Sequence, residues 1–175
     1  LAWRQWEKSR AMHTLAMQDP LTGAASRIGI EDEAARALAQ ARDDGKPLSL
    51  LMLDLDHFKS VNDRYGHAAG DAVLRAAVDA WEGQLRGRDP LGRVGGEEFV
   101  VVCPDTTEAQ ARVVAGRLLE ATRGLRFPKI DPELRVSVSI GIAQCRRDEG
   151  RDSLLDRADA ALYRAKQRGR DRAEA

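Results

Sequence analysis

The residues with the clearest chemical potential stand together at Gly95-Gly96-Glu97-Glu98. Two adjacent glycines have no side chains and tolerate positive φ, so they suit a tight turn or a close approach by another molecule. The next residues, 99–102, are aromatic and β-branched, which is typical of a buried strand. The sequence therefore predicts a hairpin over 93–102 with two carboxylates at its tip. Taken alone, the pattern fits an ordinary turn with a solvated acidic shoulder equally well.

A second acidic pair, Asp54 and Asp56, follows the apolar run 48–53. Side chains two positions apart on a strand share one face, so both aspartates are expected together at the C-terminal end of that strand. Buried carboxylates are costly unless something positive binds them. Converging carboxylates with nearby backbone carbonyls suit Mg²⁺, which shares its remaining positions with substrate phosphates. A pair of such ions can clamp the attacking and leaving oxygens of a phosphoryl transfer.

Three basic residues, Lys59, Lys166 and Arg170, can balance the charge of phosphates near these carboxylates. A short helical turn with free N–H groups beside Lys59 can hold phosphate oxygens. Lys166 and Arg170 are expected four residues apart on one face of the last helix. The alternative is that these two residues only complement the helix dipole. His57 and His67 lack the compact His/Cys spacing of a zinc site.

Apolar periodicity predicts the elements that position these groups. Helices are expected over about 27–42, 72–85, 107–122 and from 153 onward, the first of them closed by Asp44-Gly45. N-caps are expected at Asp71, at Thr106 or Thr107, and at Ser153. In the 27–42 helix the inward residues are expected to be Ile28, Ile30, Ala34, Ala35, Leu38 and Ala41. Strands are expected over 48–55, 93–102 and 135–143.

This order of elements, β-α-β-β-α-β with flanking helices, predicts an α+β fold. We expect a ferredoxin-like βαββαβ core with a mostly antiparallel central sheet of about five strands. In such a sheet the end of the 48–54 strand lies beside the 95–96 hairpin. Asp54 and Glu97 are therefore expected to converge, although they are far apart in sequence.

Composition limits the classes of function. The chain has 175 residues, of which 43% are hydrophobic, and its 28 basic residues balance its 28 acidic ones. It is long enough for one domain with a substantial core, and no overall charge attracts it to nucleic acid. Its apolar runs are too short to span a bilayer, and no signal peptide pattern is present. Cys103 and Cys145 fit two reduced thiols better than a disulfide, so a cytoplasmic location is expected.

The chain begins with Leu1 inside a helical pattern, which indicates a fragment of a longer protein. We expect residues 1–18 to form a connector helix from an upstream sensory module and residues 19–175 to form the catalytic domain. The full-length protein can then be anchored to a membrane through its missing N-terminal region.

Taken together, these motifs resemble the GGDEF domain of the diguanylate cyclases, which join two GTP into cyclic di-GMP. The similarity runs from Asp19 to about Arg172 in the family's order and spacing. The matching segments are Asp54-Leu55-Asp56-His57-Phe58-Lys59, Asn62-Asp63, Tyr65-Gly66-His67, Gly70-Asp71, Gly95-Gly96-Glu97-Glu98-Phe99, Ser139-Ile140-Gly141 and 163–170. The resemblance implies a nucleotidyl-cyclase-like palm.

The resemblance also implies the catalytic roles. Asp54, the carbonyl of Leu55 and Glu97 would bind two Mg²⁺, or Mn²⁺ in their place, with Glu98 assisting. Glu97 would be the base that deprotonates the 3′-hydroxyl, and Lys59 would stabilise charge in the transition state. Adjacent strand residues point to opposite faces, so only a turn that breaks this alternation brings both glutamates to the metals.

The GTP-binding set implied by the resemblance is Phe58, Lys59, Asn62, His67, Asp71, Lys166 and Arg170. Asn62 and Asp71 would bind the guanine edge, while Lys166 and Arg170 would bind the β and γ phosphates. Each domain would hold one GTP, so catalysis would need two domains facing each other in a homodimer.

A separate inhibitory site for cyclic di-GMP is implied at Arg86 and Asp89, with Arg117 assisting, where the family carries an RxxD motif. Guanidinium groups bind phosphate in a bidentate manner and stack on guanine. The alternative is an exposed basic loop after a helix.

The sequence departs from the family at Ala24 and Ser26, which replace leucine and asparagine, and at Asp171, where asparagine is common. None of these residues is a metal or base contact. An alternative function is a catalytically silent domain that binds GTP or cyclic di-GMP as a receptor. Asp54, Glu97 and Glu98 are all present, which favours the enzyme.

Overall fold

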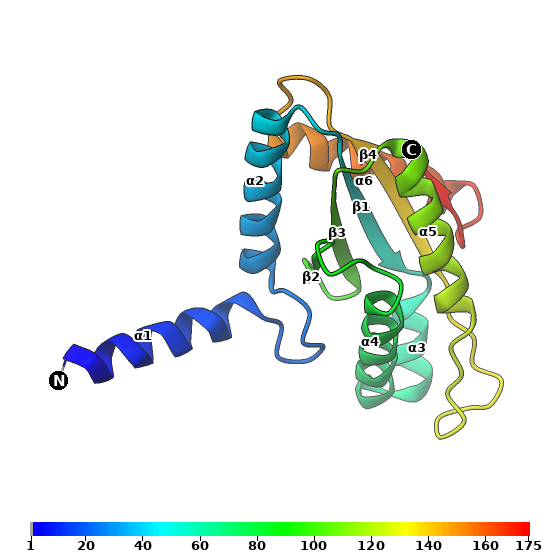
Figure 1. The fold of residues 1–175 in the computed structure, drawn as a ribbon. Helices are drawn as coiled ribbons and strands as arrows, with labels where there is room; N and C mark the ends of the chain where they lie inside the picture. The colour runs from blue at the N-terminus through cyan, green and yellow to red at the C-terminus, as the bar shows by residue number, and fades with distance from the viewer. Residues whose placement is uncertain (1) are drawn as a thin grey trace.

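The computed structural model describes residues 2–175, with side chains except at 2 and 13–15. Figure 1 shows its elements in the order α1 (Ala2–Met17), α2 (Arg27–Asp44), β1 (Leu48–Leu55), α3 (Phe58–Tyr65), α4 (His67–Glu82), β2 (Leu91–Arg93), β3 (Glu98–Pro104), α5 (Glu108–Arg123), β4 (Val138–Gln144), α6 (Arg151–Gln167) and β5 (Ala173–Glu174).

The strands form one five-stranded sheet in the order β2-β3-β1-β4-β5. The apolar strand β1 lies in the middle, antiparallel to both β3 and β4, while β5 is parallel to β4. A strand flanked on both edges and both faces needs mostly apolar residues, which explains the composition of 48–53. Its one polar residue, buried Ser49, donates from Oγ to Thr106 O at 2.8 Å. The predicted α+β fold with a mostly antiparallel sheet of five strands is confirmed.

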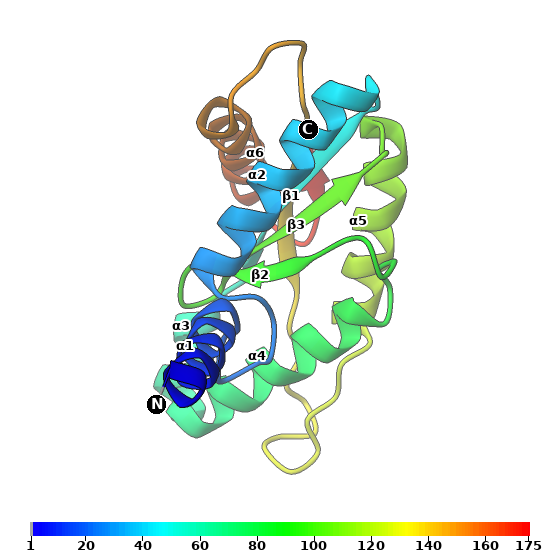
Figure 2. The same cartoon turned by 60° about the vertical axis from the view of Figure 1, so that its left-hand side comes forward.

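Each face of the sheet has its own hydrophobic core. Leu51, Leu53 and Leu55 of β1 pack with residues of α3, α4 and α5. Leu48 and Leu50 face the other way and pack with α2 and α6, which lie beside one another in Figure 2. Successive strand residues point to opposite faces, so Asp54 belongs to the α2 and α6 face.

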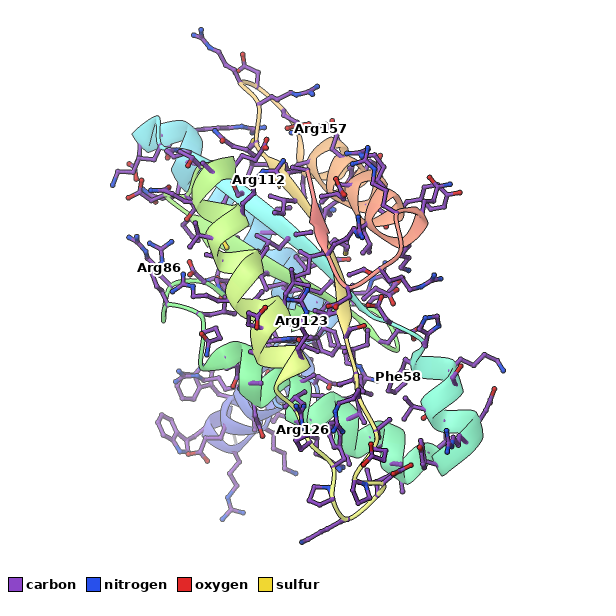
Figure 3. The ribbon with its side chains drawn as sticks, turned by 90° about the vertical axis from the view of Figure 1, so that its right-hand side faces the viewer. Phe58, Arg86, Arg112, Arg123, Arg126 and Arg157 are labelled. Carbon is purple, nitrogen blue, oxygen red and sulfur yellow. The ribbon has the colours of Figure 1, made fainter. Side chains whose placement is uncertain are left out.

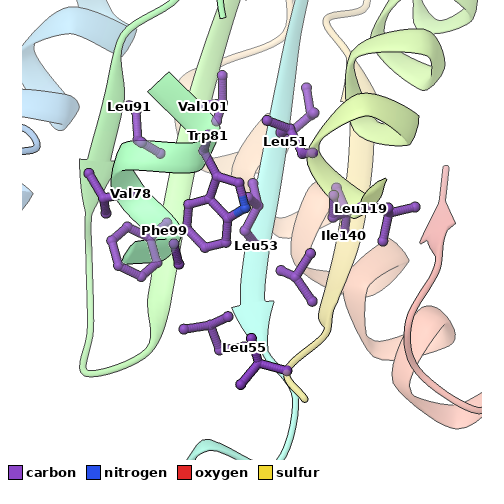
Figure 4. Close-up of a cluster of buried hydrophobic side chains, with 14 of the residues drawn as sticks. Leu51, Leu53, Leu55, Val78, Trp81, Leu91, Phe99, Val101, Leu119 and Ile140 are labelled. Atoms are coloured by element: carbon purple, nitrogen blue, oxygen red, sulfur yellow. The ribbon is translucent and has the colours of Figure 1, made fainter. Parts of the chain in front are cut away.

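Trp81 anchors the α4 side of the sheet. Its ring meets that of Phe99 edge to face at a centroid distance of 5.1 Å, in the cluster drawn in Figure 4. The indole Nε1 donates to Thr122 Oγ1 at 2.8 Å, so its buried polar atom is satisfied. This contact joins α4 to α5 behind the hairpin.

Two helices begin earlier than predicted. α4 starts at His67, so Asp71 lies inside the helix and is not its N-cap. The residue before the helix is Gly66, whose φ of 87° lies in a backbone region that favours glycine. α6 starts at Arg151 after Gly150, and Ser153 Oγ donates to Glu149 Oε1 rather than capping the helix. In both places a glycine precedes the helix, and neither glycine supplies a side-chain cap.

Other bounds agree more closely with the sequence. α2 is capped by Ser26 and ends at Gly45, where φ is 65°. Its predicted inward set was partly wrong, because Ile28 and Ala35 are exposed. Of the two threonines expected as the cap of α5, Thr107 is the N-cap and forms a capping box with Gln110. β4 begins at Val138 rather than at 135.

Helix α1 extends away from the sheet in Figure 1. Its Trp3 and Trp6 side chains are 66% and 49% exposed, so they contribute little to the core of the domain. No helix in the described part of the chain is long and apolar enough to cross a membrane. Cys103 and Cys145 are free thiols, and burial raises the pKa of Cys103 to about 12.

Candidate functional site

The candidate site lies where the C-terminal end of β1 meets the turn between β2 and β3. Leu55 N donates to Glu97 O at 3.2 Å, so the strand end and the hairpin are neighbours, as the fold predicted. The residue opposite Asp54 in the ladder is Glu98 rather than Glu97. Asp54 and Glu98 therefore share the face that α6 covers, and Glu97 lies in the turn one residue before the strand.

Lys166 offsets the charge of this acidic pair. Like charges directly opposite on neighbouring strands destabilise a sheet. Lys166 Nζ lies 2.8 Å from Asp54 Oδ2, and Asp54 is only 6% exposed. A buried carboxylate here is thus compensated by an ammonium from α6.

The oxygen donors of this site fit a magnesium ion. Among the side chains that the structure describes, no three or more from His, Cys, Asp or Glu are already grouped to hold a metal ion. Mg²⁺ is commonly held by one or two carboxylates and completes its shell with water and substrate phosphates. Asp54 and Glu98, which are opposite each other in the ladder, supply two carboxylates of that kind, and the site lacks the nitrogen or sulfur ligands that favour zinc.

The two hairpin glycines serve the site by their small size. Neither glycine has a positive φ, so the turn does not need the backbone conformations that only glycine adopts easily. A Cβ on Gly95 would lie 2.7 Å from Glu98 Oε2, whereas one on Gly96 would meet nothing within 4 Å. Gly95 makes room for Glu98, and Gly96 leaves the tip of the turn open.

Arg93 holds the hairpin and was not identified from the sequence. Its guanidinium donates to Gly96 O at 2.8 and 3.0 Å and to Asp19 Oδ2 at 3.3 Å. Asp19 also accepts from Thr22 N and Oγ1. Burial alone would raise the pKa of Asp19, but the Thr22 hydrogen bonds and the Arg93 charge lower it overall. The Asp19 turn and the glycine turn are therefore bonded together across a long stretch of sequence.

Asp56 lies in the turn just after the end of β1, and its carboxylate has hydrogen-bond donors rather than a cation. It accepts from Ser137 Oγ at 2.7 Å, Ser139 Oγ at 2.6 Å and Asp171 N at 3.1 Å. Ser139 is also the residue opposite Asp54 on β4. Three donors satisfy a carboxylate that is 6% exposed, so Asp56 has a structural position beside the site.

Lys166 and Arg170 do not lie on one helix face, contrary to the prediction. α6 ends at Gln167, and Arg170 follows Gly169 in a loop with left-handed backbone. Lys166 contacts Asp54, whereas the Arg170 side chain is exposed.

The predicted guanine-binding residues are brought close by the packing of α3 on α4. Asn62 Oδ1 is buried and has no hydrogen-bond partner in the described chain. A Cβ on Gly70 would lie 1.8 Å from this oxygen, so Asn62 sits directly against the glycine that precedes Asp71. A buried acceptor without a donor is a natural partner for an N–H group of a ligand.

The remaining predicted substrate residues differ in exposure. Phe58 is 8% exposed and belongs to the core, so it contributes to a site only through its backbone. Lys59 is exposed and pairs with Asp63 at 2.7 Å, which raises the pKa of the lysine. His67 is exposed at the first position of α4.

The predicted inhibitory residues lie away from the hairpin tip. Arg86 donates to Asp89 Oδ2 at 3.2 Å and to Thr106 Oγ1 at 2.9 Å. Asp89 is 5% exposed, and its Oδ1 has no partner among the described residues. Arg117 is exposed on α5, the helix beside which Figure 3 draws Arg86.

Comparison with protein families and curated proteins gives a consistent result. Residues 16–172 match the family described as "Diguanylate cyclase, GGDEF domain". The diguanylate cyclase DgcP of Pseudomonas aeruginosa is 40% identical over 159 residues, which are 91% of this chain and 24% of DgcP. The probable diguanylate cyclase DgcC of Escherichia coli K12 is 34% identical over 96% of this chain and 45% of its own length. The chain thus spans less than half of these relatives.

Solved structures agree in fold. The coiled coil and GGDEF domain of DgcB from Caulobacter crescentus, in complex with c-di-GMP, has a TM-score of 0.90 at 32% identity and covers 99% of this chain and 93% of that one. The diguanylate cyclase SiaD from Pseudomonas aeruginosa, in complex with its activator SiaC, has a TM-score of 0.86 at 35% identity over 98% and 67% of the two chains. The chain belongs to the GGDEF domain family of the diguanylate cyclases, with the palm fold of the nucleotidyl cyclases.

Proposed function

We propose that this domain is an active diguanylate cyclase that condenses two GTP into cyclic di-GMP with release of two pyrophosphates. The observation that carries the proposal is the acidic cluster at the end of β1. Asp54 and Glu98 are opposed in the sheet, Glu97 adjoins them in the turn, and Lys166 balances Asp54 at 2.8 Å. Like charges directly opposite in a sheet are destabilising, and a bound cation would relieve that cost.

Asp54, the Leu55 carbonyl and Glu97 would hold Mg²⁺, or Mn²⁺ in its place, with Glu98 assisting. When bound, a pair of such ions neutralises phosphate charge and favours departure of pyrophosphate. The 3′-oxygen of one GTP attacks the α-phosphorus of the other, the bond to pyrophosphate breaks, and Glu97 accepts the hydroxyl proton. The 3′-oxygen of the second GTP then attacks the α-phosphorus of the first in the same way. This step releases the second pyrophosphate and closes the ring.

The chain's own residues would bind and orient GTP. Asn62 and Asp71 would pair with the guanine edge, which gives Asn62 Oδ1 the donor that it lacks. The ammonium of Lys166 and the guanidinium of Arg170 would bind the terminal phosphates, and Lys59 would stabilise the charge of the transition state. The backbone at Phe58 and the exposed His67 would complete the nucleotide site.

The deciding experiment is incubation of the purified domain with GTP and Mg²⁺, followed by chromatography of the products. We expect cyclic di-GMP from the wild type, and at least about 100-fold less from Asp54→Asn, because that variant loses one of the carboxylates that would hold Mg²⁺. Absence of product at high protein concentration would overturn the proposal. GTP or cyclic di-GMP binding without turnover would instead support a silent receptor.

We further propose product inhibition at Arg86 and Asp89, with Arg117 assisting. These arginines present guanidinium groups on a surface outside the hairpin, and phosphates of cyclic di-GMP are suitable partners for them. Arg117→Ala is the cleaner test, because Arg86 also bonds to buried Asp89 and to Thr106. Both Arg86→Ala and Arg117→Ala should raise the cyclic di-GMP concentration that halves the rate. Unchanged inhibition in both variants would refute this site.

We place the domain in the cytoplasm, where GTP is available, and assign α1 as a connector to an upstream sensory module. The exposed tryptophans of α1 support a contact outside this domain. Catalysis would then depend on a homodimer whose geometry the upstream module sets.

A further inference from the structure

The loop that carries Arg170 has an unusual backbone. Three consecutive residues have positive φ, with Gly169 at 110°, Arg170 at 63° and Asp171 at 49°. The left-handed region is unfavourable for residues that have a Cβ, and such residues persist there only when the surroundings hold them. Arg170 N donates to Ala165 O at 3.0 Å at the end of α6, and contacts of Asp171 with other parts of the fold hold the rest of the loop.

Two side chains from distant elements bind Asp171. Arg123, at the end of α5, donates from Nε to both carboxylate oxygens at 2.9 and 3.0 Å and from Nη2 to the Asp171 carbonyl at 3.0 Å. Asp56 accepts the backbone N–H of Asp171 at 3.1 Å. We call Asp56, Arg123 and Asp171 the Asp171 clasp; Figure 3 labels Arg123 at the lower end of α5.

The clasp rests on rigid parts of the fold. Asp56 is 6% exposed and accepts hydrogen bonds from Ser137, just before β4, and from Ser139, on β4. On the other side of the loop, Ile140 N donates to Arg172 O at 2.9 Å, and Ala173 pairs with Ile140 in the sheet. The loop is thus bonded to the sheet at its C-terminal end and to α5 through Asp171.

We propose that Asp56 and Arg123 are positioning residues that hold the Gly169–Asp171 loop so that Arg170 meets the phosphates of GTP; this inference rests on the proposed function. Asp56 is two residues from Asp54, so one strand end carries the metal-binding carboxylate and also fixes the loop. The clasp explains the aspartate at 171, because its carboxylate pairs with the Arg123 guanidinium in a way that the neutral asparagine common in the family cannot.

A purely structural role for the clasp predicts a different result. The side chains of Arg123 and Asp171 are each 41% exposed, and exposed ion pairs contribute little to stability. Breaking the pair should leave the melting temperature almost unchanged. If the loop is positioned for substrate, the loss should appear in the KM for GTP.

The test uses Arg123→Gln, with Arg126→Gln as a matched control. Arg126 lies three residues further on, and its guanidinium donates to the carbonyls of Arg123 and Leu125. We expect Arg123→Gln to raise the KM for GTP about 3- to 10-fold with kcat within about 2-fold, and Arg126→Gln to leave both unchanged. Arg123→Lys should recover part of the loss, because it keeps the charge without the planar fork.

A double-mutant cycle with Asp171→Asn examines the pair directly. Residues that act through one contact are non-additive, so Arg123→Gln should have a smaller effect when Asp171 is already asparagine. Fully additive effects, or equal KM values for Arg123→Gln and Arg126→Gln, would overturn the proposal.

Binding of a non-hydrolysable GTP analogue, measured by calorimetry, keeps this test separate from the proposed function. If the wild type makes no cyclic di-GMP, the cyclase proposal fails. The clasp is then still tested, because Arg123→Gln should weaken analogue binding by a similar factor. Unchanged analogue affinity would refute the clasp alone.

Discussion

At the scale of single residues, the contact between Asn62 and Gly70 shows how the nucleotide site depends on a missing side chain. The amide oxygen of Asn62 occupies the space that a Cβ on Gly70 would need. Asp71, which the sequence placed at an N-cap, lies inside α4 and is therefore free to contact a ligand. The guanine-binding role inferred for these residues thus has a local geometric basis.

We predict that Gly70→Ala lowers kcat/KM for GTP by about 10- to 100-fold, because Asn62 must move by more than an ångström to avoid the new methyl group. Steady-state kinetics with GTP would measure the change, and circular dichroism would check folding. Gly150→Ala is a suitable control, because a Cβ there meets nothing within 4 Å and the residue lies outside both proposed ligand sites. Equal kinetics for both variants would contradict the prediction.

At the scale of elements, the hairpin is shaped by Arg93 and by the turn at 19–23. Arg93 donates to the carbonyls of both hairpin glycines and to Asp19. A two-residue glycine turn on its own has many accessible conformations, so these bonds limit where Glu97 can lie.

We predict that Arg93→Ala lowers kcat by about 10-fold or more through misplacement of the hairpin glutamates. It should also return the pKa of Asp19 toward its usual value, since one of the charges that lower it is removed. Turnover assays and NMR titration of Asp19 would measure the two effects. Normal turnover with an altered Asp19 pKa would show that the hairpin holds its shape without Arg93.

Glu149, two residues before α6, has a lowered pKa. Arg157 donates to Glu149 Oε1 at 2.7 Å, and this contact, together with hydrogen bonds from Arg146 N and Ser153, lowers the pKa of Glu149 from 4.5 to about 2. A lowered carboxyl pKa stabilises the fold above the unfolded value near 4.5, and that contribution is lost as the pH falls toward 2.

We predict that Glu149→Gln lowers the free energy of unfolding at pH 7 by about 2–3 kcal/mol and flattens its decline between pH 4.5 and 2. Urea unfolding at several pH values would measure both changes. Asp152→Asn, which also removes one carboxylate but at a side chain that is 87% exposed, is the matched control. If the free energy of unfolding of Glu149→Gln still falls steeply between pH 4.5 and 2, other carboxylates cause that fall and the prediction is wrong.

At the scale of the whole molecule, the proposed reaction needs two active sites that face each other. Each domain would hold one GTP, and ring closure requires two 3′-hydroxyls and two α-phosphates in one assembly. A homodimer with two-fold symmetry satisfies that requirement.

We predict that specific activity falls on dilution, in proportion to protein concentration once the domain is mostly monomeric. Initial rates measured across a dilution series, with light scattering for mass, would test this. Mixing with excess Asp54→Asn should also lower the rate, since mixed dimers have one defective site. A rate per protomer that is independent of concentration for a monomer would contradict the dimer mechanism.

Local patterns were sufficient for much of the fold. β1 has both predicted bounds, because a short and almost wholly apolar run is typical of a strand buried on both faces. The Thr107 cap and the Gly45 end of α2 followed from side-chain and φ preferences within a few residues. The order of these elements then predicted the sheet and placed the hairpin beside β1.

Contacts between distant segments required the tertiary structure. The residue opposite Asp54, the bonds from Arg93 to Asp19 and the Asp171 clasp each join residues more than 40 positions apart. Periodicity states which face a side chain takes, but it does not state the register of two strands or the partner of a guanidinium. The sequence alone therefore determined the family, the fold and the candidate residues, whereas three-dimensional packing decided how those residues are held, because long-range register and ion pairing have no local signature.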